Sequence, residues 1–466
     1  TMAEKQMSTD GYRVQNPATG EVLETFEHAT DEEVQQILTR AAEGYRAWSE
    51  KTIEQRGEIV QKVADLFAER KEELARIITE EMGKPHAEGV EEAEFCADIF
   101  GYFVKNGPKL GADQEIESFS GGKAYVQKRP IGALLGIMPW NFPYYQIARF
   151  AAPNLMLGNV IILKHAEICP RSAQAVQQIM DDAGIPAGVY ANVFATHDQI
   201  AEIIADPRVQ GVSLTGSERA GSIIGALAGQ HLKKAVLELG GSDPYVILDT
   251  DDVAAAARTA WETRIYNTGQ VCNANKRLIV MDEIYDEFVA QLKSLAEGMT
   301  PGETIDVDAK TFTPMSSRAA AENLDAQVRR AVEQGAELVA GGGLRDEASA
   351  YYAPAVLTGI TSEMDAYREE LFGPVAAVYR VSSDEEALHL ANDTQYGLGG
   401  AVFSQDTARA QRLAERLEVG MANVNTPAGE GPEIPFGGVK RSGFGRELGP
   451  LGMDEFVNKR MYYVAD

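Results

Sequence analysis

The chain has 466 residues, enough for two or three domains, and its 44% hydrophobic and 24% charged residues are typical of a folded globular protein. Its 70 acidic and 43 basic side chains give a formal net charge of −27, which repels nucleic acid and anionic lipid, so neither is expected as a partner. No apolar run reaches the roughly 20 residues that span a bilayer, and no basic-then-apolar leader is visible, which favours a cytoplasmic location.

The first part of the chain is predicted to be helical. Thr30-Asp31-Glu32-Glu33 is a capping-box start for a helix that continues to about Trp48. Two long helical patterns follow, near 53–82 and 86–105. The polar segment 111–130 has a central Ser-Gly-Gly and the length of a protruding β-hairpin.

Apolar strand-like runs alternate with amphipathic helices between about 132 and 248, which predicts a parallel sheet with crossover helices. Ligands bind beyond the carboxyl ends of the strands in such sheets. The residues that follow the runs are therefore candidates for a site: Trp140, Asn141, Lys164, Gly216, Ser217 and Glu238. A second alternating region runs from about 251 to 428, with strands expected near 276–281, 374–380, 398–404 and 420–425.

The tail 455–466, "EFVNKRMYYVAD", is short, alternating and aromatic, which indicates an edge strand. Exposed strand edges pair readily with another chain. We therefore expect a homo-oligomer, a dimer or a tetramer, assembled through the 111–130 hairpin and this tail.

Cys272 lies in "NTGQVCNANKR" (267–277), between two turns rich in glycine and asparagine. Free cysteine is most often a small buried hydrophobe, but a nucleophile is the alternative. The other cysteines, Cys96 and Cys169, are far away in sequence, and no CxxC or HExxH spacing occurs, so neither a disulfide nor a metal site is expected. A cysteine hydrolase would need a histidine base, and no histidine lies within thirty residues of Cys272.

Other candidates are ambiguous when each is taken alone. Glu238 ends an apolar run in "LELGGSDP". It is either a functional carboxylate or a solvated residue at a strand end. Asn141 in "PWNFP" is a functional amide or a turn residue. Gly216 and Ser217 in "LTGSERAG" form a strand-to-helix turn that either meets a diphosphate or is only structural. Neither GxGxxG nor the Walker-type phosphate loop is present.

Together, seven motifs resemble the aldehyde dehydrogenase family in their order along essentially the whole chain. They are "PWNFP" (139–143), Lys164-x-x-Glu167, "TGS" (215–217), "LELGG" (237–241), "GQVC" (269–272), "EELFGPV" (369–375) and "PFGGVKRSGFGRE" (435–447). The resemblance implies an α/β fold with a Rossmann-like parallel-sheet NAD(P)-binding domain (2–110 and 131–239), a second α/β catalytic domain (240–450) and a small β oligomerisation element (111–130 and 451–466).

The resemblance also implies the chemistry, namely oxidation of an aldehyde to a carboxylic acid through a thiohemiacetal and a thioester. Cys272 would be the nucleophile, and the Asn141 amide would bind the oxyanion. Glu238 would activate the water that hydrolyses the thioester, which argues against the alternative of a CoA-acylating enzyme. A chain that keeps the fold but has lost catalysis is a further alternative, disfavoured because both Cys272 and Glu238 are present.

The cofactor implied is NAD or NADP. The residues expected to bind it are Trp140, Lys164 and Glu167 for the adenosine half, Gly216 and Ser217 for the diphosphate, and Leu239, Glu370 and Phe372 nearer the nicotinamide. A carboxylate at Glu167 accepts bonds from ribose hydroxyls and repels a 2′-phosphate, which gives a slight preference for NAD, with dual use expected.

Within the family, "LKHA", "LKKAVLELGGSDP" and "GFGRELG" resemble the succinate-semialdehyde dehydrogenase branch, so succinate semialdehyde is the expected substrate. Arg149 would pair with its carboxylate, unless it bonds a neighbouring acidic side chain. Tyr266 occupies the place of a second arginine in that branch, Arg264 lies two residues further back, and Ala274 replaces a second cysteine. Glutarate semialdehyde and uncharged aliphatic or aromatic aldehydes therefore remain alternatives.

Overall fold

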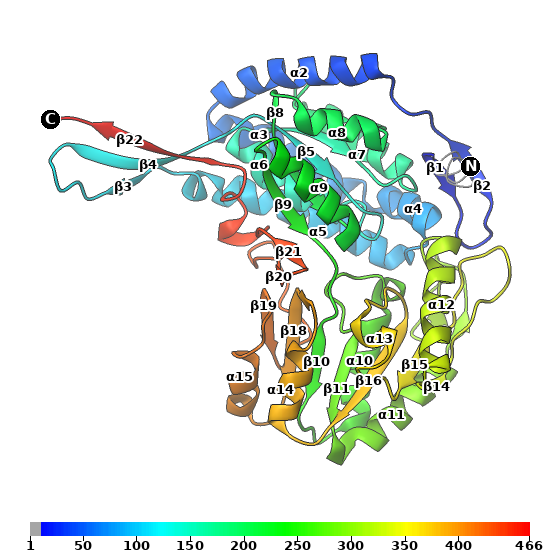
Figure 1. Cartoon of the computed structure of the whole chain (residues 1–466). Coiled ribbons are helices and arrows are strands. Elements are labelled where there is room, and N and C mark those ends of the chain that lie inside the picture. The colour runs from blue at the N-terminus through cyan, green and yellow to red at the C-terminus, as the bar shows by residue number, and fades with distance from the viewer. Residues whose placement is uncertain (1–10) are drawn as a thin grey trace.

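The computed structural model describes residues 11–466, so residues 2–10 of the expected cofactor domain lie outside the described part of the chain. The chain begins there with a short hairpin and four helices (Figure 1). Their bounds are β1 Arg13–Gln15, β2 Val22–Thr25, α2 Asp31–Glu50, α3 Ile53–Glu69, α4 Lys71–Met82 and α5 His86–Leu110. The expected capping box is formed, because the Thr30 side chain accepts from Glu33 N–H at 3.1 Å. The helical pattern expected over 53–82 is divided in two at Arg70.

The first large sheet has six strands in the order β21-β9-β8-β5-β6-β7, and its alternation with helices agrees with the prediction. Five strands are parallel: β5 Ala133–Ile137, β6 Val160–Lys164, β7 Tyr190–Asn192, β8 Val209–Thr215 and β9 Lys234–Glu238. The connecting helices are α6 Tyr145–Leu157, α7 Pro170–Asp182, α8 His197–Ala205 and α9 Glu218–Gln230. The sixth strand, β21 Gly443–Phe444, pairs antiparallel with β9. The carboxyl ends of the parallel strands therefore lie at one edge of the sheet, and the candidate residues that follow these strands are brought to that edge.

The second large sheet has seven strands in the order β14-β15-β16-β11-β10-β18-β19. They are β10 Pro244–Ile247, β11 Arg277–Met281, β14 Glu337–Ala340, β15 Ala355–Thr358, β16 Val375–Val381, β18 Gly399–Phe403 and β19 Met421–Val424. Only β14 runs antiparallel. Its helices are α10 Val253–Ile265, α11 Asp282–Glu297, α12 Arg318–Glu333, α13 Asp365–Arg368, α14 Asp384–Asn392 and α15 Thr407–Ala414. The four strands expected here are present, whereas β10, β14 and β15 were not foreseen.

Buried strands and helices on both faces form the core of this second sheet. Val246 of β10 packs into one hydrophobic cluster, and its neighbours Tyr245 and Ile247 pack into another on the opposite face. Strands buried on both faces are apolar without alternation, and a short run such as β10 is then hard to recognise from its pattern. The remaining short elements are β12 Thr300–Pro301, β13 Thr311–Phe312, β17 Tyr396–Gly397, β20 Val439–Lys440 and the 3₁₀ turns η1 Tyr266–Gly269 and η2 Gly449–Leu451.

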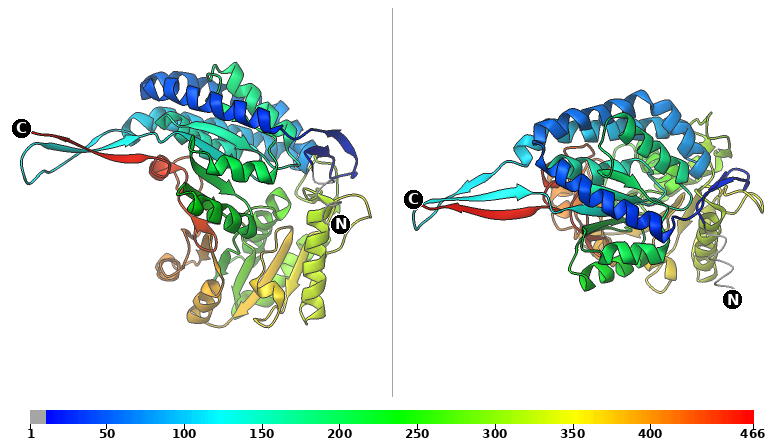
Figure 2. Two further views of the ribbon diagram at one scale, coloured as in Figure 1. Left: turned by 45° about the horizontal axis from the view of Figure 1, so that its top comes forward. Right: turned by 90° about the horizontal axis from the view of Figure 1, so that it is seen from above.

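A three-stranded antiparallel sheet projects from the body, as all three views show (Figures 1 and 2). It contains the expected hairpin, β3 Gln114–Ile116 and β4 Lys123–Arg129, and the expected tail strand, β22 Asn458–Val464. The tail pairs along its length with β4 of the same chain. Its side chains are exposed, Met461 by 69%, and Phe119 at the hairpin tip is 94% exposed.

The segment after residue 435 returns to the first sheet. Strand β21 joins β9, and Phe436, Leu448 and Phe456 pack into the core of the first sheet. The end of the predicted 240–450 catalytic range therefore packs with the cofactor-side sheet, because an edge strand of that sheet is supplied from far along the chain. Within residues 11–466, no helix is long and apolar enough to cross a membrane.

Candidate active site

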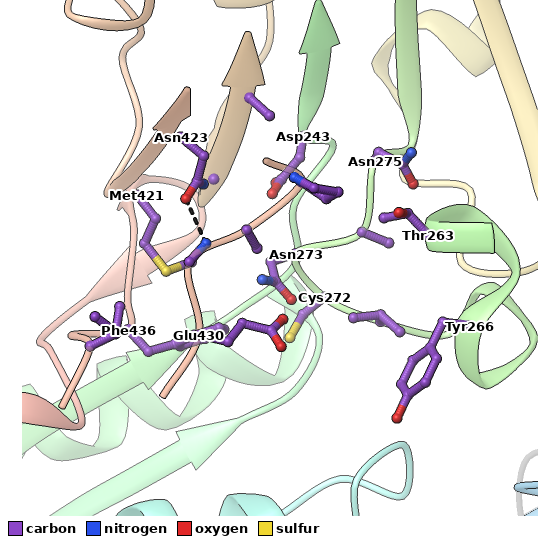
Figure 3. A pocket seen from close by; sticks show the side chains of 18 of the residues that line it. Asp243, Thr263, Tyr266, Cys272, Asn273, Asn275, Met421, Asn423, Glu430 and Phe436 are labelled. Carbon is purple, nitrogen blue, oxygen red and sulfur yellow. Dashed lines mark hydrogen bonds between the residues drawn. The ribbon is translucent and has the colours of Figure 1, made fainter. Parts of the chain in front are cut away.

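Cys272 lines a cavity of about 680 Å³ whose walls come from many elements (Figure 3). Helix α5 contributes Glu91 and Phe95, helix α6 contributes Tyr145, and the loop before Phe436 contributes Glu430. Figure 3 shows the Cys272 sulfur and the Glu430 carboxylate facing the same space. The cavity is large enough for a small organic substrate.

The backbone that leads to Cys272 is left-handed over three residues. Asn267, Thr268 and Gly269 have φ values of +51°, +56° and +74°. Such values are unusual for a β-branched residue, and strain of this kind gathers at functional sites. Gly269 is required here, because a Cβ would lie 2.2 Å from the Gly373 carbonyl oxygen. The loop is anchored from α5, since Glu88 Oε1 accepts from Asn267 N–H at 2.7 Å.

The structure brings Asn141 against this loop. Its Nδ2 donates to the Gln270 carbonyl at 3.2 Å, and its own carbonyl accepts from Asn267 Nδ2 at 2.9 Å. Its Oδ1 accepts from Gln146 Nε2 at 3.0 Å, which fixes the orientation of the amide with its NH₂ directed towards the loop. The residue is 4% exposed, and its side chain bonds the Cys272 loop and Gln146 rather than its own turn. A held amide beside a cysteine is suited to an oxyanion.

Glu238 is 2% exposed at the end of β9, which excludes a solvated strand end. Neither carboxylate oxygen has a hydrogen-bond partner among residues 11–466. Burial raises its pKa well above the usual value, the charge of Arg149 lowers it, and Glu447 raises it further. A raised carboxyl pKa is typical of a general base or acid that works near neutral pH.

Arg149 is fully buried on α6, and its contacts are to the protein. Nε donates to Glu447 Oε1 at 2.9 Å and Nη2 to Thr215 Oγ1 at 3.2 Å. The guanidinium lies 4.4 Å from the ring centroid of Phe436 and 5.0 Å from that of Tyr145, and both rings line the cavity. Nη1 has no hydrogen-bond partner in the described part of the chain. Arg149 therefore pairs with a neighbouring carboxylate, as the alternative to a substrate-binding role expected. Its Nη1 is the one guanidinium nitrogen without a partner among the described residues.

Acidic side chains dominate the charged part of the cavity wall. Tyr266, 37% exposed, donates its hydroxyl to Glu91 Oε2 at 2.9 Å. The acidic residues of the wall are Glu91, Glu92, Glu94, Asp98, Asp243, Glu262 and Glu430. Among the described residues, the wall includes no lysine, arginine or histidine. An anionic substrate would therefore need the guanidinium that lies behind Tyr145 and Phe436, or amide donors.

The residues expected to bind a dinucleotide gather at the carboxyl ends of the first sheet. Lys164 Nζ pairs with Glu167 Oε1 at 2.8 Å, and His197 Nε2 lies 3.6 Å from the same oxygen. Burial is the largest influence on Glu167 and raises its pKa, but the two bases together lower that pKa to about 2. The carboxylate is thus ionised and partly neutralised at neutral pH.

The diphosphate and nicotinamide candidates have suitable surroundings. Ser217 caps the 13-residue helix α9 by accepting from Ala220 N–H at 3.1 Å, and a Cβ at Gly216 would meet only Leu214, at 3.6 Å. This leaves open space at a helix N-terminus, where phosphates bind. The rings of Trp140 and Phe372 lie 5.7 Å apart in a T-shaped arrangement. These features together fit a dinucleotide: the Lys164–Glu167 pair can bind a ribose, the N-terminus of α9 can bind phosphates, and the rings of Trp140 and Phe372 can contact the aromatic parts.

Leu239 and Glu370 complete that set. Leu239 is 6% exposed and donates its N–H to Ser442 O at 2.9 Å. Glu370 Oε2 accepts from Gly241 N–H at 2.8 Å and pairs with Lys276 at 2.6 Å. Lys276 was not among the site residues predicted from the sequence, although its position four residues after Cys272 could have indicated that it lies in the site.

Two further buried groups were not given roles from the sequence. Glu447 ends the 435–447 motif, but its partner Arg149 lies far away in the sequence, so no local pattern predicts this ion pair. Arg264 is 0% exposed and donates to the carbonyls of Val375, Gly269 and Leu371, so it braces the Cys272 loop rather than the cavity.

Burial raises the pKa of the Cys272 thiol above its usual value. The charges of Arg149 and Lys276 lower this pKa, and those of Glu370 and Glu238 raise it. Attack by sulfur requires the thiolate, so the two buried cations favour the reactive form.

Comparison with known proteins gives consistent matches over the whole length. Residues 3–462 match the aldehyde dehydrogenase family. A Deinococcus radiodurans succinate-semialdehyde dehydrogenase (NADP+) is 49% identical, with 96% of this chain and 93% of that protein covered. An Escherichia coli succinate semialdehyde dehydrogenase (NAD(P)+) is 41% identical, with 95% and 96% covered. The crystal structure of succinic semialdehyde dehydrogenase from Streptococcus pyogenes in complex with NADP+ superposes with a TM-score of 0.95 at 41% identity, covering 98% of this chain and 100% of that one.

Proposed function

The chain belongs to the aldehyde dehydrogenase family, and from this we propose that it oxidises succinate semialdehyde to succinate with NAD(P)+. The observation that carries the chemistry is Cys272 at a cavity wall, with the Asn141 amide held against its loop. The buried carboxylate of Glu238, which has no hydrogen-bond partner among residues 11–466, lies close enough to raise the pKa of the Cys272 thiol. Residues 11–110 and 131–239 would form the described part of the cofactor domain, and 240–450 the catalytic domain.

The reaction begins with the thiolate of Cys272. Its sulfur adds to the aldehyde carbon, and the carbonyl electron pair moves to oxygen. The Nδ2 of Asn141 and the backbone N–H of Cys272 donate to this oxyanion, which stabilises the thiohemiacetal. When bound, NAD(P)+ supplies the acceptor for the hydride of that carbon. A thioester on Cys272 remains.

Glu238 then acts on water. Its carboxylate takes a proton from water, the oxygen attacks the thioester carbon, and the C–S bond breaks. The products are the carboxylic acid and the thiolate of Cys272. Because Glu238 is buried without a hydrogen-bond partner within residues 11–466, its carboxylate is basic enough for this task.

The substrate assignment rests on the names of the relatives and on one donor. Arg149 Nη1 is the unused donor of a guanidinium that lies against two cavity rings. A shift of Phe436 or Tyr145 would let a substrate carboxylate reach it. Tyr266, which lines the cavity, would contact the carbon chain of the substrate. The relatives do not favour the alternative substrate, an uncharged aldehyde.

The relatives' names favour NADP and do not support the slight preference for NAD expected from the sequence. Glu167 would repel a 2′-phosphate, but Lys164 and His197 beside it offset that repulsion. We therefore propose that both cofactors bind, with Lys164 and Glu167 at the adenosine ribose and Ser217 and Gly216 at the diphosphate. Trp140, Leu239, Glu370 and Phe372 would complete the cofactor site.

The exposed apolar side chains of β22 and the hairpin tip support assembly into a homodimer or homotetramer through the projecting sheet.

The test is a steady-state comparison of succinate semialdehyde, glutarate semialdehyde and butanal, each with NAD+ and NADP+, for the parent and Cys272→Ala. We expect the highest kcat/KM for succinate semialdehyde and no oxidation by Cys272→Ala. Activity that survives in Cys272→Ala would overturn the chemistry. A parent that prefers butanal would overturn only the substrate.

A further inference from the structure

Lys276 is a buried lysine, 1% exposed, whose ammonium joins three segments of the active site. Its Nζ donates to the carbonyl of Gly241 at 2.9 Å and to the carbonyl of Cys272 at 2.8 Å, and it pairs with Glu370 Oε2 at 2.6 Å. An ammonium has three donors. All three are occupied, so Lys276 acts through the groups that it joins rather than on a ligand.

Glu370 is held firmly in this arrangement. Its Oε2 also accepts from Gly241 N–H at 2.8 Å, and a Cβ at Gly240 would lie 2.5 Å from its Oε1. The segment around Glu370, the turn after Glu238 and the Cys272 loop are thus fixed together around one ion pair. The Nζ of Lys276 lies 5.2 Å from the ring centroid of Phe372, so its charge stays close to the aromatic wall as well.

We propose that Lys276 is a positioning residue that tunes the nucleophile, with its charge stabilising the Cys272 thiolate and its ion pair with Glu370 limiting that stabilisation. The proposal rests on the proposed function, in which Cys272 is the nucleophile. A nearby cation favours a thiolate and a nearby carboxylate opposes it, and both effects are strong where water is excluded. The lysine therefore sets the reactivity of the sulfur without touching the substrate.

Other charged and titratable groups also face the thiol. They are Arg149 and Tyr145 on α6, Glu238 at the end of β9, Glu370 in the 369–374 segment, and Glu430 on the cavity wall. Arg149 is the second cation, but it is committed to Glu447. Lys276 and Glu370 form a separate pair, so each can be changed without breaking the Arg149 pair.

The experiment measures the pH dependence of Cys272 alkylation by iodoacetamide in the full-length enzyme without cofactor. Cys272→Ala supplies the blank, since Cys96 and Cys169 are fully buried. We expect Lys276→Met to raise the apparent pKa of the thiol by about one unit, which makes alkylation about tenfold slower at neutral pH. We expect Glu370→Gln to lower that pKa and speed alkylation.

The opposite signs are the decisive result, because both variants break the same ion pair. If Lys276 only braced the loop, the two variants would shift the thiol pKa in the same direction or leave it unchanged, and either result overturns the proposal. Lys276→Arg keeps the charge and should keep the parent profile, and Lys293→Met on the surface of α11 is the matched control.

If Lys276→Met does not fold, as judged by circular dichroism, Glu370→Gln and Lys276→Arg decide the question. A thiol pKa that does not fall in Glu370→Gln, or that rises in Lys276→Arg, then overturns the proposal. The alkylation readout needs no turnover, so a failure of this proposal is distinguished from a failure of the proposed function, which is shown by aldehyde oxidation that survives in Cys272→Ala.

Discussion

Replacing Glu238 with glutamine should slow turnover and at the same time stabilise the fold at higher pH. The parent carboxyl is 2% exposed, its oxygens lack hydrogen-bond partners among the described residues, and burial holds its pKa well above the usual value. Glutamine has nearly the same shape and cannot ionise. The variant therefore removes both the base and the cost of burying a charge.

The sign of the stability effect follows from proton binding. Between the unfolded pKa of about 4.3 and the raised folded pKa, the native state keeps a proton that the unfolded state has lost. The parent's stability therefore falls as the pH rises through this window, by about 1.4 kcal/mol for each pH unit. Glu238→Gln does not undergo this loss, so its stability advantage over the parent should grow as the pH rises through the window.

Calorimetry of both proteins between pH 5 and pH 8 measures the difference in melting temperature. The exposed Glu347→Gln serves as the matched control, because it makes the same substitution at the protein surface. In rapid-mixing assays, Glu238→Gln should release about one reduced cofactor per site in a burst, followed by a steady-state rate roughly 10²- to 10⁴-fold slower. In the parent, hydrolysis should speed up as the pH rises through the pKa of Glu238. A pH-independent difference in melting temperature would refute the buried-charge argument, and an unchanged steady-state rate would refute the role as base.

Three further predictions concern the substrate, the cofactor and the assembly. Arg149→Met should lower kcat/KM about 30- to 1000-fold on succinate semialdehyde and much less on butanal, because a charge-assisted bond is lost only with the first; equal losses would mean that Arg149 serves only to pair with Glu447. Glu167→Ser should shift the ratio of kcat/KM values towards NADP+, since it removes a charge that repels the 2′-phosphate, and an unmoved ratio would exclude Glu167 as the discriminator. Met461→Asp on the exposed face of β22 should weaken the oligomer by light scattering at micromolar concentration, and a parent that is already monomeric would contradict assembly through this strand.

Local patterns in the sequence were sufficient to predict most of the elements, whereas the chemistry-bearing residues were predicted only from the order of seven motifs along the chain. The capping box at Thr30, the five parallel strands of the first sheet and the tail strand have periodicities that depend only on neighbouring residues. Cys272, Asn141 and Glu238 each lie at a turn or strand end, but this position alone left each ambiguous, and the resemblance of the combined motifs predicted their roles. The structure adds that the first two are linked through Gln270 and that Glu238 is buried, not solvated.

Contacts between distant segments were decided only by the tertiary structure. β10 and β15 are short apolar runs in the sequence, and only their pairing with a strand on either side identifies them as internal strands of the second sheet. The partner of Arg149 is Glu447, and that of Lys276 is Glu370, each pair joined across a large part of the chain by the packing of the two sheets. Side-chain period reveals which face is buried, but it carries no information on which distant residue lies opposite. The sequence therefore predicted which residues react, and the packing of the two sheets decided which charges surround them.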